Sequence, residues 1–399
     1  MLGLGSVTGL QSARILADRG VPVYGLATDP RHFPARTGVC ERVLRSDVQG
    51  PGLLDDLLAL GPTLSGRAVL VPCTDQSVLT VSRHRHVLAP WYHLRLPPDD
   101  VVHALTDKAT FHEHVRSRGL PTPRTHVLRE RHDAEIAAKD LDYSALLKPG
   151  FKTTRWKQHT CVKAVTVQDP DDLLAVYDRV GHWAETMVAQ EYVVGGDDQL
   201  FTCNTHYGAD GTPLVEFVTR KRRQWPIGVG TVSYGEEARN DEVLAETRRL
   251  FSGIGFVGLG YLEVKCDRRT ARGSLIEANI GRPTGRSATA EAAGVELLFT
   301  FYCDAAGLVL PPVAQCRQRY VGAVWIDLRR DLLSSWQHRR DGELGVRDWW
   351  SSLRRRPKAH AVWSPRDPAP ALFEVVQSGH QALRRLPGLL RRRLRPSGE

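Results

Sequence analysis

The alternation of short apolar runs with amphipathic segments over residues 1–100 constrains the fold of this chain more than any other feature. The runs VPVYGLAT (21–28) and AVLVPCT (68–74) have the length of buried strands, and GLQSARILADRG (9–20) has helical periodicity. Strands that alternate with helices are typical of a parallel sheet. We therefore expect residues 1–100 to form an α/β domain of the Rossmann-like kind.

A glycine-rich turn, GLGSVTG, places Gly3, Gly5 and Gly9 between the first strand and this helix. Its spacing, G-x-G-x-x-x-G, is close to a dinucleotide fingerprint without matching it. The turn could hold an anion at the helix N-terminus, or it could only let the helix pack tightly on the sheet, and the second interpretation is favoured. Asp29 could contact a ribose or be an ordinary turn residue. Because only two residues precede the turn, we expect the first strand to be incomplete or its start to be misassigned.

The remaining chain mixes helices and strands. DKATFHEHVRSRG (107–119) predicts an amphipathic helix, and LPTPRTHVL (120–128) leads into a strand. Two strand-like runs, ALLKPG (145–150) and TCVKAVTV (160–167), flank a polar loop, FKTTRWKQH (151–159). A helix, a strand at MVAQEYVV (187–194) and further strands with one helix follow up to residue 280. The tryptophan- and proline-rich region 320–370 is expected to pack irregularly.

Composition limits the class of protein. A chain of 399 residues with a mean hydropathy of −0.30 can bury a large core in two or three domains. It has no apolar run long enough to span a bilayer and no signal-peptide pattern at its start. Its seven cysteines lack a CxxC pair, which favours reduced thiols and a cytoplasmic protein over a zinc site or a disulfide framework.

The net charge of +9 is concentrated at the C-terminal end. The last sixteen residues hold six arginines and one glutamate, a local charge of +5, so the high pI does not require a nucleic-acid-binding surface. Five leucines interleave with these arginines, which predicts peripheral contact with a membrane surface, although Pro387 would kink a helix there. A solvated, unstructured tail over residues 381–399 is the favoured alternative.

Two strand ends carry oxygen ligands. In LIEANIGR (275–282), Glu277 and Asn279 lie two positions apart and so face the same side of a strand, and Glu263 ends the preceding run, GYLEVK. Two carboxylates and one amide suit a hard cation such as Mg²⁺. Taken by themselves, they are more often a solvated strand end.

Other polar residues stand at comparable places. Lys148 ends a strand just before the polar loop, where it could hold a polyphosphate, and Lys108 opens a helix, a position that a cation favours only when an anion is nearby. Residues 190–193 could present a strand edge to an adenine, and Asp197 could accept from ribose hydroxyls. Each of these residues alone is weak evidence, and a lysine at a strand end is usually only solvated.

In order, these landmarks resemble the ATP-grasp superfamily. The segments are TDK, LLKP, QEYVVGGD, KRRQWPIGVGT, GFVGLGYLEVKCD and LIEANIGR, after a glycine-rich α/β start. The set is most similar to the branch of carboxylate–amine ligases that includes carbamoyl-phosphate-synthase-like and D-aspartate-ligase-like enzymes. The resemblance implies a pre-ATP-grasp domain (1–100), a small subdomain with a clamp loop at 150–159 (101–195) and a large subdomain with the metal site (196–310). A C-terminal extension (311–380) and the basic tail would follow.

The resemblance also implies roles for individual residues. Lys108 and Lys148 would contact the phosphates of ATP, and Asp197 would bind the ribose. Adenine would be held by Gln190, Glu191 and Val193, with Tyr192 packed below it. Two Mg²⁺ ions, for which Mn²⁺ could substitute, would be held by Glu263, Glu277 and Asn279.

Three segments depart from the family pattern or leave a choice open. One extra residue precedes Arg282 in ANIGRPTGRS, so either Arg282 or Arg286 could face the transferred phosphoryl group. In KRRQWP, Lys221 and Arg223 are expected to face the phosphate or acylphosphate, with a basic turn as the alternative. The clamp loop is bulky, although Lys152, Thr153, Thr154, Arg155 and Lys157 could still contact phosphate.

The function that the resemblance implies is ATP-dependent ligation of a small-molecule carboxylate, such as an amino acid or a peptide, to an amine. An acylphosphate would be the intermediate, and ADP and phosphate would be released. A catalytically inactive nucleotide-binding scaffold is the alternative from another class. An NAD-dependent oxidoreductase explains less of the chain, because the glycine-rich turn lacks the full fingerprint.

Overall fold

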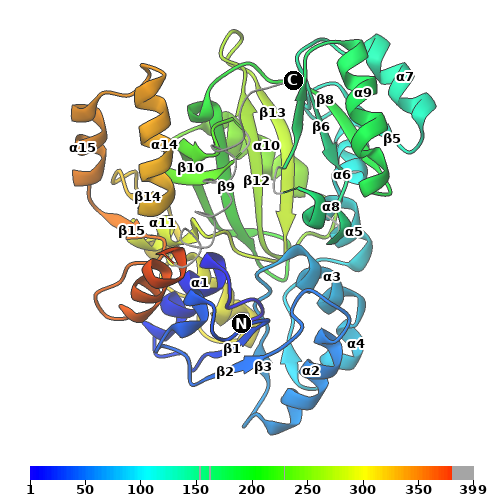
Figure 1. Cartoon of the computed structure of the whole chain (residues 1–399). Coiled ribbons are helices and arrows are strands. Elements are labelled where there is room, and N and C mark those ends of the chain that lie inside the picture. The colour runs from blue at the N-terminus through cyan, green and yellow to red at the C-terminus, as the bar shows by residue number, and fades with distance from the viewer. Residues whose placement is uncertain (152–153, 161–162, 229, 380–399) are drawn as a thin grey trace.

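The N-terminal part is a parallel α/β unit, as predicted. The computed structural model describes residues 1–151, 154–160, 163–228 and 230–379. Strand β1 (Tyr24–Ala27) pairs in parallel with β2 (Arg42–Arg45), and β3 (Ala68–Val69) pairs in parallel with β4 (Tyr92–His93). Leu2 bridges both pairs, because it lies between Leu26 and Pro72. The helices of this unit are α1 (Val7–Ala17), α2 (Leu53–Leu60), α3 (Asp75–Arg83) and α4 (Arg85–Leu88). The unit lies at the bottom of Figure 1.

A second unit is built on an antiparallel sheet of order β5-β8-β6-β7. Its strands are β5 (Thr125–Leu128), β6 (Ala145–Pro149), β7 (Val165–Val167) and β8 (Met187–Glu191). Helices α7 (Arg131–Asp140) and α9 (Pro170–Val180) pack against it around a core of their own that includes Leu147 and Leu173. Helices α5 (Asp99–Thr106) and α6 (Lys108–Ser117) connect this sheet to the N-terminal unit. The predicted amphipathic helix thus forms and ends before Gly119, whose φ is +62°.

The segment expected to be a polar loop contains a helix, α8 (Thr154–His159), so that prediction was wrong for these residues. Trp156 is 1% exposed. Its ring lies edge-on to Trp183 at 5.8 Å, and His159 stacks on Trp183 at 4.7 Å. Burial of a large aromatic side chain stabilises a helix that its polar neighbours do not predict.

The largest sheet has seven strands, in the order β13-β12-β9-β10-β11-β14-β15. The strands are β9 (Leu200–Tyr207), β10 (Pro213–Trp225), β11 (Thr231–Glu237), β12 (Gly258–Cys266), β13 (Gly273–Ile280), β14 (Val324–Ile326) and β15 (Lys358–His360). Only the outermost pair, β14 and β15, is parallel. The helices of this part are α10 (Asp241–Phe251), α11 (Ser287–Ala292), α12 (Leu297–Ala306), α13 (Val313–Cys316), α14 (Leu328–Arg340) and α15 (Val346–Arg354).

The region 320–370 is therefore more regular than its composition predicts. Strands β14 and β15 extend the large sheet, and α14 and α15 stand beside it in orange in Figure 1. Trp325 is 2% exposed in β14. The irregular packing expected from tryptophans and prolines was wrong because short strands can be stabilised by an existing sheet edge.

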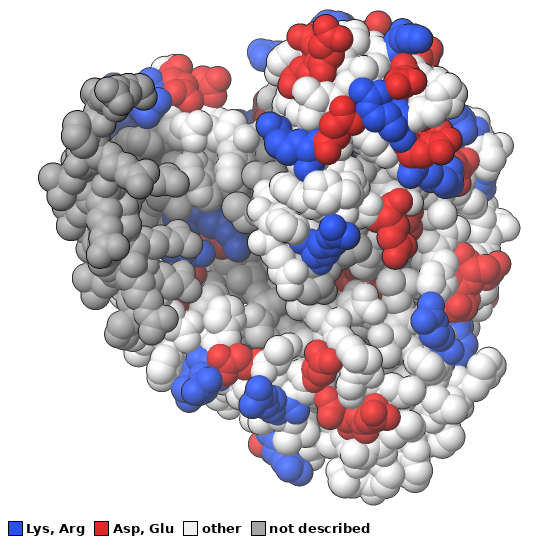
Figure 2. All heavy atoms as spheres, turned by 45° about the vertical axis from the view of Figure 1, so that its right-hand side comes forward, with Lys and Arg blue, Asp and Glu red and all other residues white. Residues whose placement is uncertain are grey.

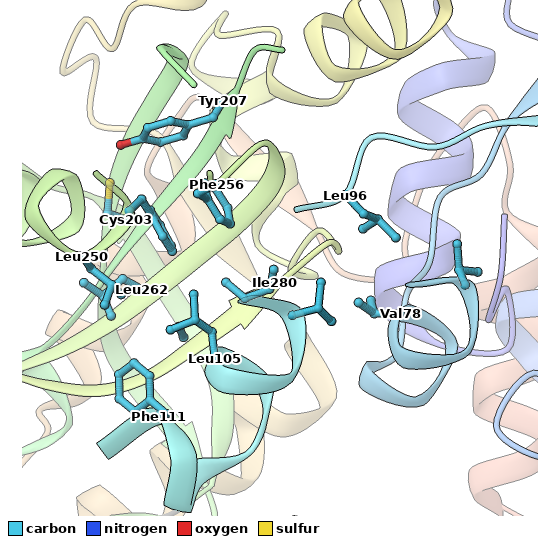
Figure 3. Close-up of a cluster of buried hydrophobic side chains, with 14 of the residues drawn as sticks. Val78, Leu96, Leu105, Phe111, Cys203, Tyr207, Leu250, Phe256, Leu262 and Ile280 are labelled. Carbon is cyan, nitrogen blue, oxygen red and sulfur yellow. The ribbon is translucent and has the colours of Figure 1, made fainter. Parts of the chain in front are cut away.

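One hydrophobic core joins the N-terminal unit, the connecting helices and the large sheet. Figure 3 shows Leu105 and Phe111 of the connecting helices beside Ile280 of β13, with Phe256 and Cys203 farther along the large sheet. All five of these side chains are buried. The core fixes the connecting helices, and hence Lys108 at the start of α6, against the strands that carry the oxygen ligands. In the described part of the chain, no helix has the length and apolar character needed to cross a membrane.

Candidate functional site

The predicted oxygen ligands lie together on adjacent antiparallel strands. Glu263 of β12 is directly opposite Glu277 of β13, and Tyr261 is opposite Asn279. Residues opposite one another on a sheet have Cβ atoms about 5 Å apart. Because Glu277 and Asn279 share a face of β13, the two carboxylates and the amide can converge on one point.

A cation contacts each of these three residues. Lys108 Nζ is 3.2 Å from Glu277 Oε2, and Arg286 Nη2 is 3.0 Å from Glu263 Oε1. Arg282 donates to Asn279 Oδ1. Burial lowers the pKa of Lys108, but Glu277 and Asp75 outweigh burial and raise it above its ordinary value. Lys108 is thus charged at neutral pH. Its ion pair with Glu277 could be exchanged for other contacts if a metal ion bound the carboxylate or a phosphate bound the lysine.

These groups open into a cavity of about 1140 Å³. Figure 2 shows the surface hollowed there, with charged side chains inside the hollow. The side chains of the sequence-predicted site that line it are Lys108, Lys221, Glu263, Glu277, Asn279, Arg282 and Arg286. The N-terminal unit contributes a second wall through residues 5–8 and 73–76, and the C-terminal part contributes Asp327, Arg329, Arg330 and Glu374. A cavity of this size can hold a nucleotide and a second small molecule.

Two further lysines of the predicted site are buried, and of these two Lys221 lines the cavity while Lys148 is not among its lining residues. Lys148 Nζ donates to Gln190 Oε1 at 2.8 Å, and Lys221 Nζ donates to Gln224 Oε1 at 2.9 Å. Burial lowers the pKa of Lys221 to about 8, although the charge of Glu263 opposes this shift. Both lysines are 6% exposed, which means that they are held in place rather than solvated.

The predicted strand edge at residues 190–193 is occupied at its start. Strand β8 lies between β5 and β6, so Gln190 pairs with both Thr125 and Leu146. The Glu191 amide donates to Arg124 O. The edge interpretation was therefore wrong for Gln190 and Glu191, because a second strand covers the side that was expected to be open.

The residues after β8 make local contacts. The Tyr192 amide donates to Ser144 O, and its hydroxyl donates to Gly195 O at 3.2 Å. Lys265 Nζ lies 4.0 Å from the centre of the Tyr192 ring, and Val193 is 9% exposed. A ligand could therefore contact the backbone of this segment only beyond Glu191, where β8 ends.

Asp197 lies at the start of a short 3₁₀ helix. Its Oδ1 accepts from Gln224 Nε2 at 2.6 Å and from the Gly228 amide at 3.3 Å. Burial raises its pKa, although Lys221 and Gln224 act in the opposite direction. Within the described residues, its buried Oδ2 has no hydrogen-bond partner. Asp197 is therefore connected to Lys221 through Gln224.

Arg223 was predicted to face a phosphate, and the structure contradicts that placement. Its Nε and Nη2 lie 2.8 and 3.0 Å from the two oxygens of Asp331, which is fully buried on α14. Its guanidinium also lies 4.4 Å from the centre of the Tyr234 ring. The pairing of β10 with β11 is irregular between Lys221 and Arg223, so their side chains point in different directions. Of the two, Lys221 lines the cavity.

Sequence reasoning missed several residues that support the site. Asp75 pairs with Arg282, and the Tyr261 hydroxyl accepts from Arg282 Nη1 at 2.8 Å. Asp75 follows the strand-like run AVLVPCT and opens α3 behind a Thr74 cap, so its place at a strand end was a readable signal. His112 contacts Gln190 and gave no such signal, because it lies inside a helix.

The glycine-rich turn shows the close packing favoured at the sequence level. A Cβ on Gly9 would lie 2.4 Å from Gly3 O, so no side chain fits there. The Ser6 hydroxyl accepts from the Gly9 amide and caps α1. Asp29 is exposed and pairs with Arg31 two residues away. A turn that lets α1 approach the sheet accounts for these contacts without a bound dinucleotide.

The donor set fits a hard cation. Two carboxylates and an amide oxygen are ligands that Mg²⁺ prefers, and the Asn279 Oδ1 accepts from Arg282, a hydrogen bond that a bound ion would replace. Among the described residues, no group of three or more histidine, cysteine, aspartate or glutamate side chains is placed to hold a metal ion.

Comparison with known proteins identifies the fold. No protein-family model matches the chain. A D-aspartate ligase from Enterococcus faecium (strain Aus0004) is 21% identical over 243 residues, which are 56% of this chain and 55% of that protein. The match thus spans about half the length of this curated relative.

Solved structures match over more of the chain. The biotin carboxylase domain of a 2-oxoglutarate carboxylase from Hydrogenobacter thermophilus, in complex with MgADP, has a TM-score of 0.62 at 14% identity, covering 78% of this chain and 70% of that one. An N5-carboxyaminoimidazole synthetase from Staphylococcus aureus with ADP has a TM-score of 0.61 at 18% identity, covering 77% and 76%. An L-amino acid ligase from Bacillus licheniformis has a TM-score of 0.58 at 14% identity, covering 76% and 72%.

These solved structures are ATP-grasp enzymes. The chain has an ATP-grasp fold. The resemblance found in the sequence is thereby confirmed at the level of the fold.

The segment 150–159, for which the resemblance implies a clamp loop, is only partly described. Lys152 and Thr153, and the side chains of Thr154 and Lys157, lie outside the described residues, and Arg155 is exposed at the start of α8. The basic tail 381–399 also lies outside them.

Proposed function

We propose that this protein is an ATP-dependent ligase that joins a carboxylate to an amine through an acylphosphate. The observation that carries this proposal is the facing pair Glu263 and Glu277, with Asn279 beside them, in a cavity that basic side chains also line. The fold supports it, because a solved structure that matches contains MgADP and another contains ADP. The D-aspartate ligase and the L-amino acid ligase favour an amino acid or a peptide as one substrate.

The nucleotide would lie between the two antiparallel sheets. Lys108 and Lys148 would bind its phosphates, the adenine would lie against the segment that follows Glu191, and the ribose would face Asp197. Glu263, Glu277 and Asn279 would hold two Mg²⁺ ions, which would neutralise the phosphate charge during transfer.

The side chains of the cavity would bring two anions together. A substrate carboxylate oxygen attacks the γ-phosphorus of ATP. The bond between this phosphorus and the β-phosphate oxygen breaks, and ADP leaves. The amine lone pair then attacks the acyl carbon, the C–O bond to phosphate breaks, and the amine loses a proton. Lysine and arginine side chains offset the repulsion between the carboxylate and the phosphate in the first step.

No enzyme nucleophile is needed for this chemistry. Burial raises the pKa of Cys73, which lines the cavity, and of Cys203 to about 12. Both are therefore thiols at neutral pH and poor nucleophiles.

Of the two candidate arginines, we assign the transferred phosphoryl group to Arg286. Arg282 already contacts Asp75, Tyr261 and Asn279. Arg286 contacts Glu263 through Nη2, and its Nε and Nη1 have no partner within the described residues. Its guanidinium retains donors for an anion when a metal takes Glu263.

The test is release of ADP and phosphate across pairs of carboxylates and amines, with Glu277→Gln as the diagnostic variant. We expect the wild type to release ADP only when both substrates are present, and Glu277→Gln to lose at least about a hundredfold in turnover. Glu113→Gln, which changes an exposed carboxylate on α6, is the matched control. ATP binding without turnover over the whole screen would instead favour the inactive scaffold, and wild-type turnover by Glu277→Gln would remove the metal assignment.

A further inference from the structure

Four charged side chains of the C-terminal part line the cavity, and the chemistry proposed above uses none of them. Asp327 directly precedes α14, and Arg329 and Arg330 lie in its first turn. Glu374 comes from a segment farther along the chain. Arg330 Nη1 is 3.0 Å from Asp327 Oδ2, and Arg329 Nε is 3.1 Å from Glu374 Oε1. The cluster thus consists of two ion pairs and has no net charge.

The two ion pairs are close enough to influence each other. Burial raises the pKa of Glu374, the charge of Asp327 raises it further, and Arg329 and Arg330 oppose the shift. The carboxylates are mostly buried, with 4% of the Asp327 side chain and 15% of the Glu374 side chain exposed, whereas both arginines are more exposed. Asp327 also caps α14, because its Oδ1 accepts from the Arg330 amide at 3.1 Å. The carboxylates are therefore fixed, and the arginines can turn toward a ligand at little cost.

The segment that carries Glu374, red in Figure 1, is held against the N-terminal unit. Gln377 Oε1 accepts from the Phe33 amide at 3.3 Å, and the Arg36 guanidinium lies 4.8 Å from the centre of the Phe373 ring. Phe33 itself lines the cavity. This part of the cavity wall is thus assembled from separate regions of the chain, which fixes the Glu374 carboxylate relative to α14.

The cluster adjoins the arginine that we assign to the transferred phosphoryl group. Trp325 of β14 lies two residues before Asp327 and directly opposite Gly235 of β11. A Cβ on Gly235 would be 3.8 Å from Arg286 Cδ, so Arg286 lies against β11 at the position opposite Trp325. Trp325 also lines the cavity, and its buried Nε1 has no hydrogen-bond partner in the described part of the chain. An indole N–H can only donate, so it suits an oxygen that a ligand would supply.

The balance of charge indicates what kind of ligand the cluster can accept. A ligand with a single charge would break an ion pair and leave one member of it without a partner. A zwitterion can replace both partners, because its carboxylate can bind a guanidinium while its ammonium binds a carboxylate. Guanidinium groups also match the planar geometry of a carboxylate.

We propose that Asp327, Arg329, Arg330 and Glu374 form the subsite for the α-ammonium and α-carboxylate groups of an amino acid substrate. The two arginines bind its carboxylate, and the two acidic side chains bind its ammonium. An amino acid held by both groups has only its side chain left to react, so the subsite selects amino acids with a side-chain carboxylate or amine. This inference rests on the proposed function for the reaction and adds to it the residues that recognise one substrate.

The experiment measures binding of amino acids to the full chain by titration calorimetry, with Mg²⁺ and the nonhydrolysable ATP analogue AMPPNP present. The probes are the L and D forms of aspartate, glutamate and lysine. Succinate, glutarate and ε-aminocaproate lack the α-ammonium, and β-alanine, γ-aminobutyrate and cadaverine lack the α-carboxylate. We expect at least one probe to bind, and both of its analogues to bind about tenfold or more weakly, because each loses a charge-assisted contact.

Glu374→Gln and Arg329→Gln test the cluster itself. Each should weaken binding of that amino acid by about tenfold or more, while the affinity for AMPPNP stays within about twofold of wild type. Glu296→Gln and Arg19→Gln are the matched controls. This pair also joins a mostly buried glutamate to a more exposed arginine, at 3.0 Å, and neither of these described residues lines the cavity. The controls should leave both affinities within about twofold of wild type.

Three results would overturn the inference: no probe binds, the analogues bind as tightly as the amino acid, or the cluster variants bind it as the controls do. If AMPPNP still binds in such a case, the proposed function stands, because ADP release can depend on other substrates. If AMPPNP does not bind, the nucleotide assignment fails, and the same titrations without AMPPNP decide the subsite by the same criteria.

Discussion

Arg223→Met is the substitution whose outcome best separates a structural role from a catalytic one. The Arg223 guanidinium makes two contacts to Asp331, at 2.8 and 3.0 Å, and a third to Ser352 Oγ at 3.0 Å. Removing it leaves a fully buried carboxylate whose other donors include Trp349 Nε1 and Ser233 Oγ. Breaking one partner of a buried ion pair costs about 3–5 kcal/mol, because the remaining charge keeps its desolvation penalty.

The free energy of unfolding should therefore fall by about 3–5 kcal/mol in Arg223→Met. Urea unfolding followed by tryptophan fluorescence is a suitable assay, since Trp349 bonds directly to Asp331. The double variant Arg223→Met, Asp331→Leu should recover most of the loss, because apolar replacement of both partners is often close to neutral. Arg131→Met, at an exposed pair with Asp178, is the control and should leave the free energy of unfolding nearly unchanged.

The opposite result would refute this reasoning. If Arg223→Met unfolds like the control while ADP release collapses, the guanidinium acts on a ligand, and the ion pair with Asp331 is not its main role. If the double variant is no more stable than the single one, the loss does not come from an uncompensated carboxylate.

Further predictions follow from the site and the glycine-rich turn. Because burial lowers the pKa of Lys221 to about 8, the affinity for the nonhydrolysable ATP analogue AMPPNP should fall as the pH rises through about 8. The unfolded chain keeps this proton up to the higher, ordinary pKa of lysine, so the contribution of Lys221 to the free energy of unfolding should increase with pH above about 8. Lys221→Met should remove both pH dependences. Lys148→Ala should raise the ATP concentration needed for half-maximal ADP release by about tenfold or more, and an unchanged value would make Lys148 a structural residue only. Gly9→Ala should destabilise the fold by about 1–3 kcal/mol in urea unfolding, because its Cβ would meet Gly3 O at 2.4 Å, whereas Gly5→Ala has no neighbour closer than 4.0 Å and should be tolerated.

Local patterns were sufficient for the elements whose stability is local. Helix α6 forms within the predicted amphipathic segment 107–119, and the structure shows Asp107, Asp169 and Asn240 as the caps of α6, α9 and α10. The parallel sheet of the N-terminal unit likewise follows from alternating strands and helices. In both cases the information lies within about ten to twenty consecutive residues, which is the range that periodicity reports.

Elements stabilised by distant partners were not predicted. Helix α8 depends on Trp156 packing against Trp183, and β14 and β15 depend on the edge that β11 offers. The region 320–370 was misjudged for the same reason, because its short strands have no local pattern strong enough to identify them.

The sequence by itself determined which oxygen ligands can meet, since the period of two in a strand places Glu277 and Asn279 on one face wherever that strand lies. It could not determine where the basic side chains point. Lys221 and Arg223 are two residues apart on β10, yet one lines the cavity and the other is buried against Asp331. Only the tertiary structure decided this. The pairing of β10 with β11 is irregular between the two residues, and the Arg223 guanidinium binds a carboxylate that lies more than a hundred residues away in the chain. Charged side chains go where burial is compensated, and their partners are set by the packing of sheets and helices rather than by neighbours in the chain.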